Sequence, residues 1–218
     1  MEVILVYNFL DYDLVEIVDS DLIKVDMQYP KLGMDYAIDK CYLKKCVYER
    51  LKIAATYLPD GYTLIIFDAY RPFELQKELF DKYSIIIEKK FHLENYSEYD
   101  RNKFINKFVS IPDDYNPPSH TTGGAIDITL AYNGDYLDLG CGFDEFCDES
   151  YTNFFKDYKD SESINIHKNR MILYNCMTKA GFTNLESEYW HYDYGNRNWA
   201  NITGNAVLYD EIIKLSDK

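Results

Sequence analysis

The dipeptide Asn133-Gly134 is the feature that most constrains the fold of this chain. An Asn-Gly pair readily adopts the positive φ angles of a tight two-residue turn, which joins neighbouring antiparallel strands. It stands between an apolar run at residues 125–131 and the segment Tyr136-Leu137-Asp138-Leu139. We therefore expect these two segments to pair as an antiparallel hairpin within a sheet.

A second apolar run, at residues 62–67, predicts a buried strand that leads into a helix. The run is short and rich in β-branched residues, and it follows the turn residues Pro59-Asp60-Gly61. Pro72 suits the first turn of a helix, whose body we expect from residue 73 to about residue 87. The segment Asp68-Ala69-Tyr70-Arg71 should therefore lie where the strand ends and the helix begins.

Apolar side chains that recur every three or four residues predict further helices. We expect these at residues 40–58, 167–180 and 207–215, with Gly181 ending the second, and a short one near residues 101–108. The rest of 88–116 and the acidic stretch 144–163 should be loop, and 182–194 should be extended. The sequence has neither a repeat nor a low-complexity linker. These elements predict an α+β fold, with helices flanking a mainly antiparallel sheet, in a single domain spanning residues 1–218.

Composition and charge restrict the partners of the chain. Its 218 residues carry a formal net charge of -14, which disfavours binding to nucleic acids and anionic membranes. No segment reaches the roughly 18 to 20 apolar residues that span a membrane. No basic region precedes the short apolar run at Met1–Val6. We expect a cytoplasmic protein whose partner is a small molecule or a peptide, and the sequence predicts no oligomeric state.

The cysteines do not form a recognisable framework. Five occur, which is an odd number, and no C-x-x-C pair is present; they are Cys41, Cys46, Cys141, Cys147 and Cys176. This pattern fits neither a set of disulfides nor a thiolate zinc site. We expect reduced thiols with a structural role.

Two separate segments contain histidine and acidic residues, the residue types that commonly bind metals. His120 and Asp127 lie seven positions apart across Gly123-Gly124, and Glu188-Tyr189-Trp190-His191 follows far downstream. A catalytic zinc usually has three protein ligands and an open position for water. His120, Asp127 and His191 meet that need, and Glu188 is then placed to act as general base on the water.

Each segment has a simpler interpretation when taken alone. His120 and Asp127 are then a loop cap and a turn residue, and Glu188 and His191 lie on a solvated strand face. Only the joint occurrence is specific for a metal site. The other two histidines, His92 and His167, stand in polar surroundings and are interpreted as surface residues.

Arg71 also has two interpretations. It either pairs with a nearby carboxylate, Asp68 or Glu74, or directs its guanidinium into a cleft, where it stabilises an oxyanion. The sequence leaves both open.

Three motifs together resemble the zinc D-alanyl-D-alanine dipeptidases of the vancomycin-resistance type. They are Asp68-Ala69-Tyr70-Arg71-Pro72, His120-x-x-Gly-x-Ala-x-Asp127 and Glu188-x-Trp-His191-Tyr192. The similarity extends in order over residues 14–200 and includes the segments 23–29 and 138–144.

The resemblance implies a function for each motif. It implies one zinc ion per chain held by His120, Asp127 and His191, with Glu188 as catalytic base and Arg71 stabilising the tetrahedral intermediate. It also implies hydrolysis of the dipeptide D-Ala-D-Ala in bacterial cell-wall metabolism. Candidates for holding the substrate ammonium are Ser119 and Asp144.

The chain departs from this family at two places. Many relatives have a serine two residues before the first zinc histidine, where this chain has Pro118, and residues 30–35 also differ from the usual form. The dipeptide it prefers therefore stays open. The alternatives are a zinc D,D- or L,D-carboxypeptidase that trims longer peptidoglycan peptides, and an inactive metal-binding or peptide-binding module.

Overall fold

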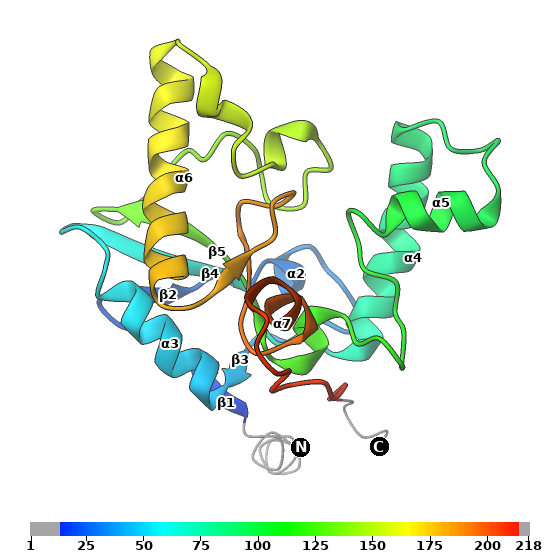
Figure 1. The fold of residues 1–218 in the computed structure, drawn as a ribbon, viewed down its shortest axis with the longest axis horizontal. Coiled ribbons are helices and arrows are strands. Elements are labelled where there is room, and N and C mark those ends of the chain that lie inside the picture. Colours follow the sequence, from blue (N-terminus) through cyan, green and yellow to red (C-terminus); the bar gives the residue numbers. More distant parts are fainter. Residues whose placement is uncertain (1–13, 214–218) are drawn as a thin grey trace.

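The computed structural model describes residues 14–213, which form a twisted sheet with helices packed on it (Figure 1). The apolar run at Met1–Val6 lies outside the described residues. The main sheet has the strand order β2-β4-β5-β8-β7, with β6 paired to β5, and β1 pairs with β3 in a separate ladder. The strands are β1 (Leu14–Ile17), β2 (Ile23–Val25), β3 (Cys41–Lys44), β4 (Tyr62–Asp68), β5 (Ala125–Tyr132), β6 (Asp135–Tyr136), β7 (Thr183–Asn184) and β8 (His191–Asp193).

The α+β class is confirmed, but the sheet is mixed. Strands β4, β5, β6, β7 and β8 pair antiparallel, whereas β2 pairs with β4 in parallel. A parallel neighbour needs a long crossover, and the chain supplies one through α2 (Gln28–Lys31), β3 and α3 (Lys45–Ala55). The predicted hairpin is present: β5 and β6 pair antiparallel across Asn133 and Gly134, both of which have positive φ. Its second strand is shorter than predicted, because residues 137–139 are not strand.

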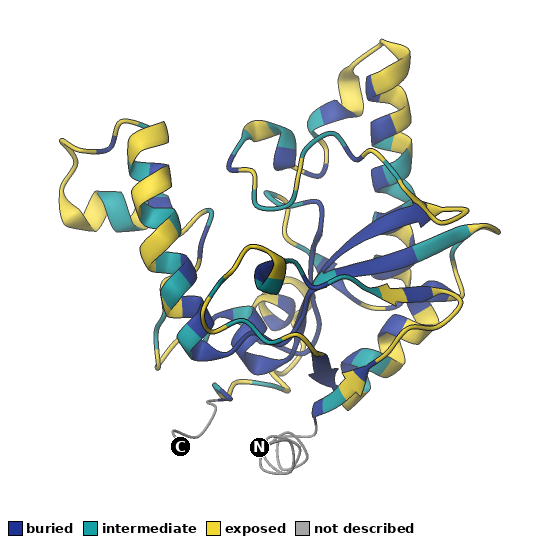
Figure 2. Cartoon of the chain, turned by 180° about the vertical axis from the view of Figure 1, so that it is seen from behind, coloured by how far each residue is buried: buried dark blue, intermediate teal, exposed yellow. Residues whose placement is uncertain are grey.

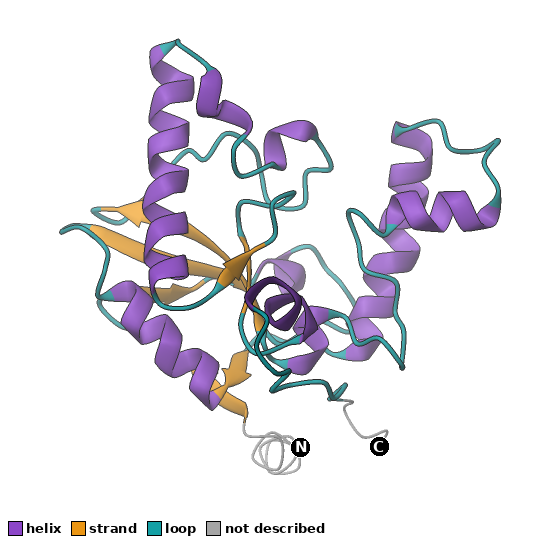
Figure 3. Cartoon of the chain, in the orientation of Figure 1, coloured by secondary structure: helices purple, strands orange, loops and turns teal. Residues whose placement is uncertain are grey.

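Two long helices cover one face of the sheet. Helix α3 and helix α6 (Ser161–Lys179) lie side by side against it (Figure 3). On α3 the buried residues Val47, Leu51 and Ala54 follow the spacing of one helical face. They pack with β-strand residues such as Leu64 and Ile128 into the main core.

Helix α4 (Phe73–Lys90) and helix α5 (Glu98–Ile105) extend away from the sheet, and their outer faces are exposed (Figure 2). Leu79 and Ile87 on α4 and Ile105 on α5 belong to a second apolar cluster. Helix α4 begins after Pro72, as predicted, and α5 is capped by Ser97, whose side chain accepts a hydrogen bond from the Asp100 amide. None of the helices within residues 14–213 is long and apolar enough to cross a membrane.

The helix predicted at residues 40–58 is wrong at its start. Residues Cys41–Lys44 form β3, all four are buried, and they pair with β1. The apolar spacing from residue 43 onward fits either structure. The partner strand β1, which is distant in sequence, decides between them.

The helix predicted at 207–215 is also wrong. Residues 207–213 are not helical, and 214–215 lie outside the described residues. A short helix, α7 (Arg197–Thr203), forms instead upstream, between an Asn196 cap and Gly204, which has φ of 73°. The amides of Leu208 and Tyr209 donate to the Gly195 carbonyl, so the segment runs back over the molecule.

Smaller differences concern element ends. Helix α6 begins at Ser161, earlier than predicted, because Asp160 caps it by accepting from the Ser163 amide. Its end before Gly181 is as expected. The stretch 144–163 also contains two short 3-10 helices, η2 (Asp148–Ser150) and η3 (Phe154–Asp157). Only β7 and β8 are extended within 182–194.

Candidate metal centre

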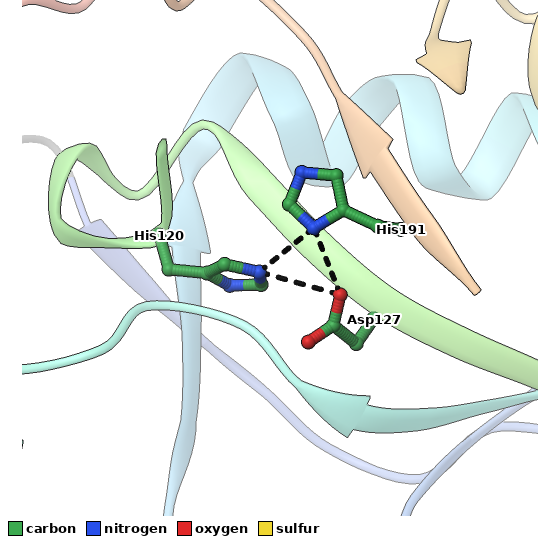
Figure 4. Close-up of side chains that lie close together, drawn as sticks. All are labelled: His120, Asp127 and His191. Atoms are coloured by element: carbon green, nitrogen blue, oxygen red, sulfur yellow. Dashed lines mark hydrogen bonds and ion pairs between the residues drawn. The ribbon is translucent and has the colours of Figure 1, made fainter. Parts of the chain in front are cut away.

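The three predicted metal ligands meet in one buried cluster (Figure 4). His120 comes from the 3-10 turn η1 (Ser119–Thr122), Asp127 from β5 and His191 from β8. Nε2 of His120 lies 3.1 Å from Nδ1 of His191 and 3.3 Å from Oδ1 of Asp127. Nδ1 of His191 lies 3.0 Å from the same carboxylate oxygen. One nitrogen of each ring and one carboxylate oxygen therefore face a common point.

Backbone geometry explains why residues distant in sequence converge. Asp127 and His191 are direct partners in the β5–β8 pairing. His120 returns to them because Gly123 ends η1 with φ of 71°, a conformation that favours glycine. A Cβ atom at Gly124 would lie 2.8 Å from the Tyr194 carbonyl oxygen, so the chain can approach β8 only with glycine there.

The arrangement fits zinc. Ligands that bind tetrahedral zinc at about 2.0–2.1 Å lie about 3.3–3.4 Å from one another. The three observed separations of 3.0, 3.1 and 3.3 Å are within a few tenths of an ångström of that value. The far ring nitrogens also have partners: Nδ1 of His120 lies 2.7 Å from the Ala69 carbonyl oxygen, and Nε2 of His191 lies 3.2 Å from Oδ1 of Asp193. Such outer contacts orient histidine ligands.

The cluster has strong internal electrostatics. Burial lowers the pKa of His191, but Asp193 and Asp127 outweigh burial, and the pKa is raised well above its usual value. Burial raises the pKa of Asp127, but the opposing effect of the two histidines is larger. The pKa is therefore held below its usual value, and Asp127 stays ionised. The negative charge of Asp193 is itself held by Asn196, whose amide donates at 2.5 Å. The donor set is anionic and enclosed, which suits a cation.

Glu188 lies in the turn that leads into β8. Its amide donates to the Leu185 carbonyl, and its own carbonyl accepts from the His191 amide. It is half-buried and lines the same cavity as the three ligands. Burial raises the pKa of its carboxyl to about 8, with Asp127 and Asp144 adding to the effect and His191 and Arg71 opposing it. A carboxyl with such a pKa exchanges protons near neutral pH.

Arg71 pairs with a nearby carboxylate and also lines the cavity. It does pair with Asp68, at 2.9 Å, and Asp68 is placed by a bulge where β4 meets β5. Yet its Nη2 also lies 3.6 Å from Asp127, and the side chain lines the cavity. Burial lowers the pKa of Arg71, but the effects of Tyr29 and Asp68 are larger, and the pKa is raised above its usual value. Arg71 is therefore a fixed positive charge beside the ligands.

Asp144 also reaches the cavity. It has φ of 57°, a conformation rare outside glycine, and its carboxylate accepts hydrogen bonds from Tyr29 at 2.9 Å and Tyr83 at 3.0 Å. Burial raises the pKa of Asp144 to about 6, although the positive charge of Arg71 lowers it. Asp144 is therefore a further acidic side chain, besides Asp127 and Glu188, that lines the cavity.

The sequence did not identify three side chains that support Arg71 and Asp144. Tyr29 accepts from Arg71 at 3.0 Å while donating to Asp144. Gln76 accepts from Arg71 at 2.8 Å, is fully buried, and donates to the Ser110 carbonyl. Tyr83 is the third. Only Tyr29 stood in a segment with a recognisable pattern; Gln76 and Tyr83 were hidden on the apolar face of α4.

The cavity is small and is joined by a larger hollow. It measures about 60 Å³, and Ser119 and Pro118 line one side. The Ser119 hydroxyl lies 3.5 Å from Nε2 of His191. Ser119, Pro118, Leu185 and Asn198 also line an adjoining hollow of about 590 Å³. Pro118 presents no hydroxyl here, and the serine hydroxyl next to His191 comes from Ser119.

The other two histidines, interpreted as surface residues, are not part of the cluster. His92 is exposed, and His167 is half-buried on α6. All five cysteines are free thiols in the structure.

Comparison with known proteins identifies the family. A family model described as D-Ala-D-Ala dipeptidase, of the peptidase M15 type, matches residues 30–211. The chain belongs to this family of metallopeptidases. The matched range includes all the proposed site residues, and the resemblance inferred from the three motifs is confirmed.

Relatives of known function agree in length. A D-alanyl-D-alanine dipeptidase of Synechocystis sp. is 30% identical over 190 residues, which cover 79% of this chain and 77% of that protein. A protein of the same name from Escherichia coli is 28% identical over 195 residues, covering 83% and 86%.

Solved structures match more distantly. VanYB in complex with D-alanine-D-alanine has a TM-score of 0.46 at 16% identity, covering 79% of this chain and 84% of that chain. A vancomycin-resistance D,D-pentapeptidase VanY in complex with Zn(II) has a TM-score of 0.43 at 16% identity, covering 79% and 89%.

Proposed function

We propose that this chain is a zinc dipeptidase that hydrolyses D-Ala-D-Ala or a closely similar small dipeptide in bacterial cell-wall metabolism. The observation that carries the proposal is the meeting of His120, Asp127 and His191 in one cavity with Glu188 and Arg71. Membership of the dipeptidase family supports the same conclusion. Residues 1–218 act as one catalytic domain, and the reaction takes place in the cytoplasm.

His120, Asp127 and His191 hold one zinc ion per chain. When bound, zinc polarises the scissile carbonyl and lowers the pKa of the attacking water. Glu188 removes a proton from that water and returns it to the leaving amine. Arg71 faces the oxyanion that develops on the carbonyl oxygen, where its charge has the greatest effect in a water-poor cavity.

The substrate is held at its ammonium end. Asp144 provides a carboxylate that lines the cavity, and Ser119 provides a hydroxyl that lines it too. Tyr29 connects Asp144 to Arg71, so the group that binds the ammonium and the group that faces the oxyanion are fixed relative to each other. A cavity of about 60 Å³ suits a short substrate.

The decisive experiment measures D-alanine release from D-Ala-D-Ala by protein of known zinc content, beside Glu188→Ala. We expect the variant to keep its zinc and to lose turnover by at least about a hundredfold. The matched control is Glu186→Ala, because Glu186 lies two positions away on the same turn but is exposed. Full activity in Glu188→Ala would show that another group is the base.

A carboxypeptidase acting on longer peptides is the second candidate. The hollow of about 590 Å³ that adjoins the cavity favours it, because the hollow has room for residues preceding the scissile bond. A pentapeptide ending in D-Ala-D-Ala distinguishes the two. Efficient pentapeptide cleavage without dipeptide turnover would replace our proposal, and stoichiometric zinc with neither activity would indicate an inactive binding module.

A further inference from the structure

The chain has a second group of metal-binding side chains, outside the catalytic cavity. The ligand atoms of Cys141, Glu145 and Cys147 lie within 4.8 Å of one another. All three belong to the loop that follows β6. This grouping was not predicted from the sequence, because the two cysteines are six positions apart and form no recognised motif.

The loop is already shaped around this group. Gly140 has φ of 91°, and the Glu145 carboxylate accepts from the Gly142 amide at 3.0 Å. The Cys147 amide donates to the Glu145 carbonyl at 2.9 Å. These contacts curl the chain so that both thiols face the same carboxylate.

Two buried side chains anchor the loop from outside. Arg170, only 1% exposed, donates to the Leu139 and Glu149 carbonyls, on either side of the loop. The Tyr189 hydroxyl donates to the Cys141 carbonyl at 3.0 Å. The loop is therefore ordered during folding, and metal binding does not carry the entropic cost of ordering it.

We propose that Cys141, Glu145 and Cys147 form a second metal site, which binds a thiophilic divalent cation of the zinc class. Two thiolates and one carboxylate supply three ligands, and water completes a tetrahedron. Sulfur atoms on tetrahedral zinc lie about 3.8 Å apart. The ligand atoms now lie within 4.8 Å of one another, so the two sulfur atoms need to approach by about 1 Å at most. Side-chain rotation achieves this.

The chemistry of the ligands selects the metal. Thiolates prefer zinc and other soft or borderline ions over magnesium or calcium. In the metal-free protein, burial raises the pKa of Cys141 to about 12. Cys147 adds to the effect, and Arg170, whose Nη2 lies 4.0 Å from the Cys141 sulfur, opposes it. Both thiols must lose protons on binding, so affinity rises with pH.

The site is separate from the catalytic centre but shares its loop. Asp144 lies between the ligands in sequence and lines the catalytic cavity, whereas Cys141 and Glu145 line a different hollow of about 520 Å³. A metal held by the loop fixes the backbone on both sides of Asp144. It therefore stabilises the loop that carries one wall of the active site.

Cobalt titration of the full-length, reduced protein tests the proposal. Thiolate ligands give Co²⁺ an intense near-ultraviolet charge-transfer band, and the histidine and carboxylate ligands of the catalytic centre do not. We expect the band in the wild type and its persistence in His120→Ala, which impairs only the catalytic centre. Cys147→Ser should weaken cobalt binding at this site by more than about a hundredfold.

The matched control is Cys46→Ser, because Cys46 is a half-buried thiol like Cys147 but contacts Tyr209 instead. It should leave the band unchanged. Absence of the band from the reduced wild type, or a wild-type cobalt affinity and band intensity in Cys147→Ser, overturns the proposal. Neither result bears on D-Ala-D-Ala hydrolysis, so this inference and the proposed function fail independently.

Discussion

Replacing Arg71 with lysine separates charge from geometry in the proposed active site. The guanidinium is almost enclosed, with its side chain 10% exposed, and it makes directed contacts with three different partners. Nη2 lies 2.9 Å from Asp68, Nη1 donates to Gln76 at 2.8 Å, and Nη2 donates to Tyr29 at 3.0 Å. A lysine ammonium is a single point charge on a flexible stem, so it can maintain only part of this set.

The expected losses follow from these contacts. A hydrogen bond to a charged group contributes about 1.5–3 kcal/mol, and the positive charge beside Asp68 is retained, so Arg71→Lys should lower the free energy of unfolding by about that amount. The catalytic loss should be larger. Removing one oriented oxyanion donor costs about 2.7–4 kcal/mol, which is about 10² to 10³ in kcat.

Steady-state kinetics with D-Ala-D-Ala, zinc analysis and denaturant unfolding measure these quantities on one preparation. We expect kcat and kcat/KM to fall together while zinc content stays at the wild-type value, because an interaction made only in the transition state affects both equally. Arg101→Lys is the control, since Arg101 forms a more exposed ion pair with Glu88 on the α4–α5 extension. Wild-type kcat in Arg71→Lys would refute the oxyanion role. If Arg71→Lys instead loses zinc, and added zinc restores its activity, then Arg71 acts by holding Asp127 in place.

Three further substitutions test the structure. Asp144→Asn should raise KM for the dipeptide and remove a rise of kcat/KM as pH increases through about 6, because Asp144 must be ionised to hold an ammonium and burial raises its pKa to about 6. The folded-state pKa lies above the unfolded value, so ionisation of Asp144 lowers stability as pH rises from about 4 to about 6; thermal unfolding should show Asp144→Asn more stable than wild type at pH 8 but not at pH 4. Arg170→Met should destabilise by about 3–5 kcal/mol in urea unfolding, because three carbonyl oxygens lose a buried cationic donor, whereas exposed Lys168→Met should change little. Gly123→Ala should destabilise by at least about 1–3 kcal/mol and reduce zinc occupancy, because its φ of 71° strains alanine and the new Cβ would lie 2.6 Å from Leu14; equal stability of wild type and variant would contradict the conformational argument.

Local sequence signals predicted the central elements of the fold well. The Asn133-Gly134 turn and the flanking apolar run identified the β5–β6 hairpin, and Pro72 identified the start of α4. These signals work because the turn and the helix start depend on neighbouring residues. Strand β3 was missed because its structure depends on pairing with β1, which local periodicity does not contain.

The C-terminal error has the same origin. Apolar residues in 207–213 are spaced like those of a helix, yet Ile213 is buried beside Leu14, Tyr42 and Tyr70 without helical structure. Its position follows from contacts with the rest of the fold. The parallel pairing of β2 with β4 is likewise a property of the whole chain path and has no local signal.

The proposed metal ligands and the proposed substrate contacts differ in how they are positioned, and this difference explains what the sequence revealed. Asp127 and His191 face each other across the register of β5 and β8, so the spacing of each motif is fixed by the sheet. Asp144 and Ser119 instead lie on a loop and a 3-10 turn, where a single change such as Pro118 alters the wall without disturbing the strands. Loops tolerate such change far better than paired strands. We therefore expect the segments around residues 110–119 and 140–147 to influence substrate choice. Exchanging them with those of a relative should change the preferred peptide while zinc binding at His120, Asp127 and His191 is retained.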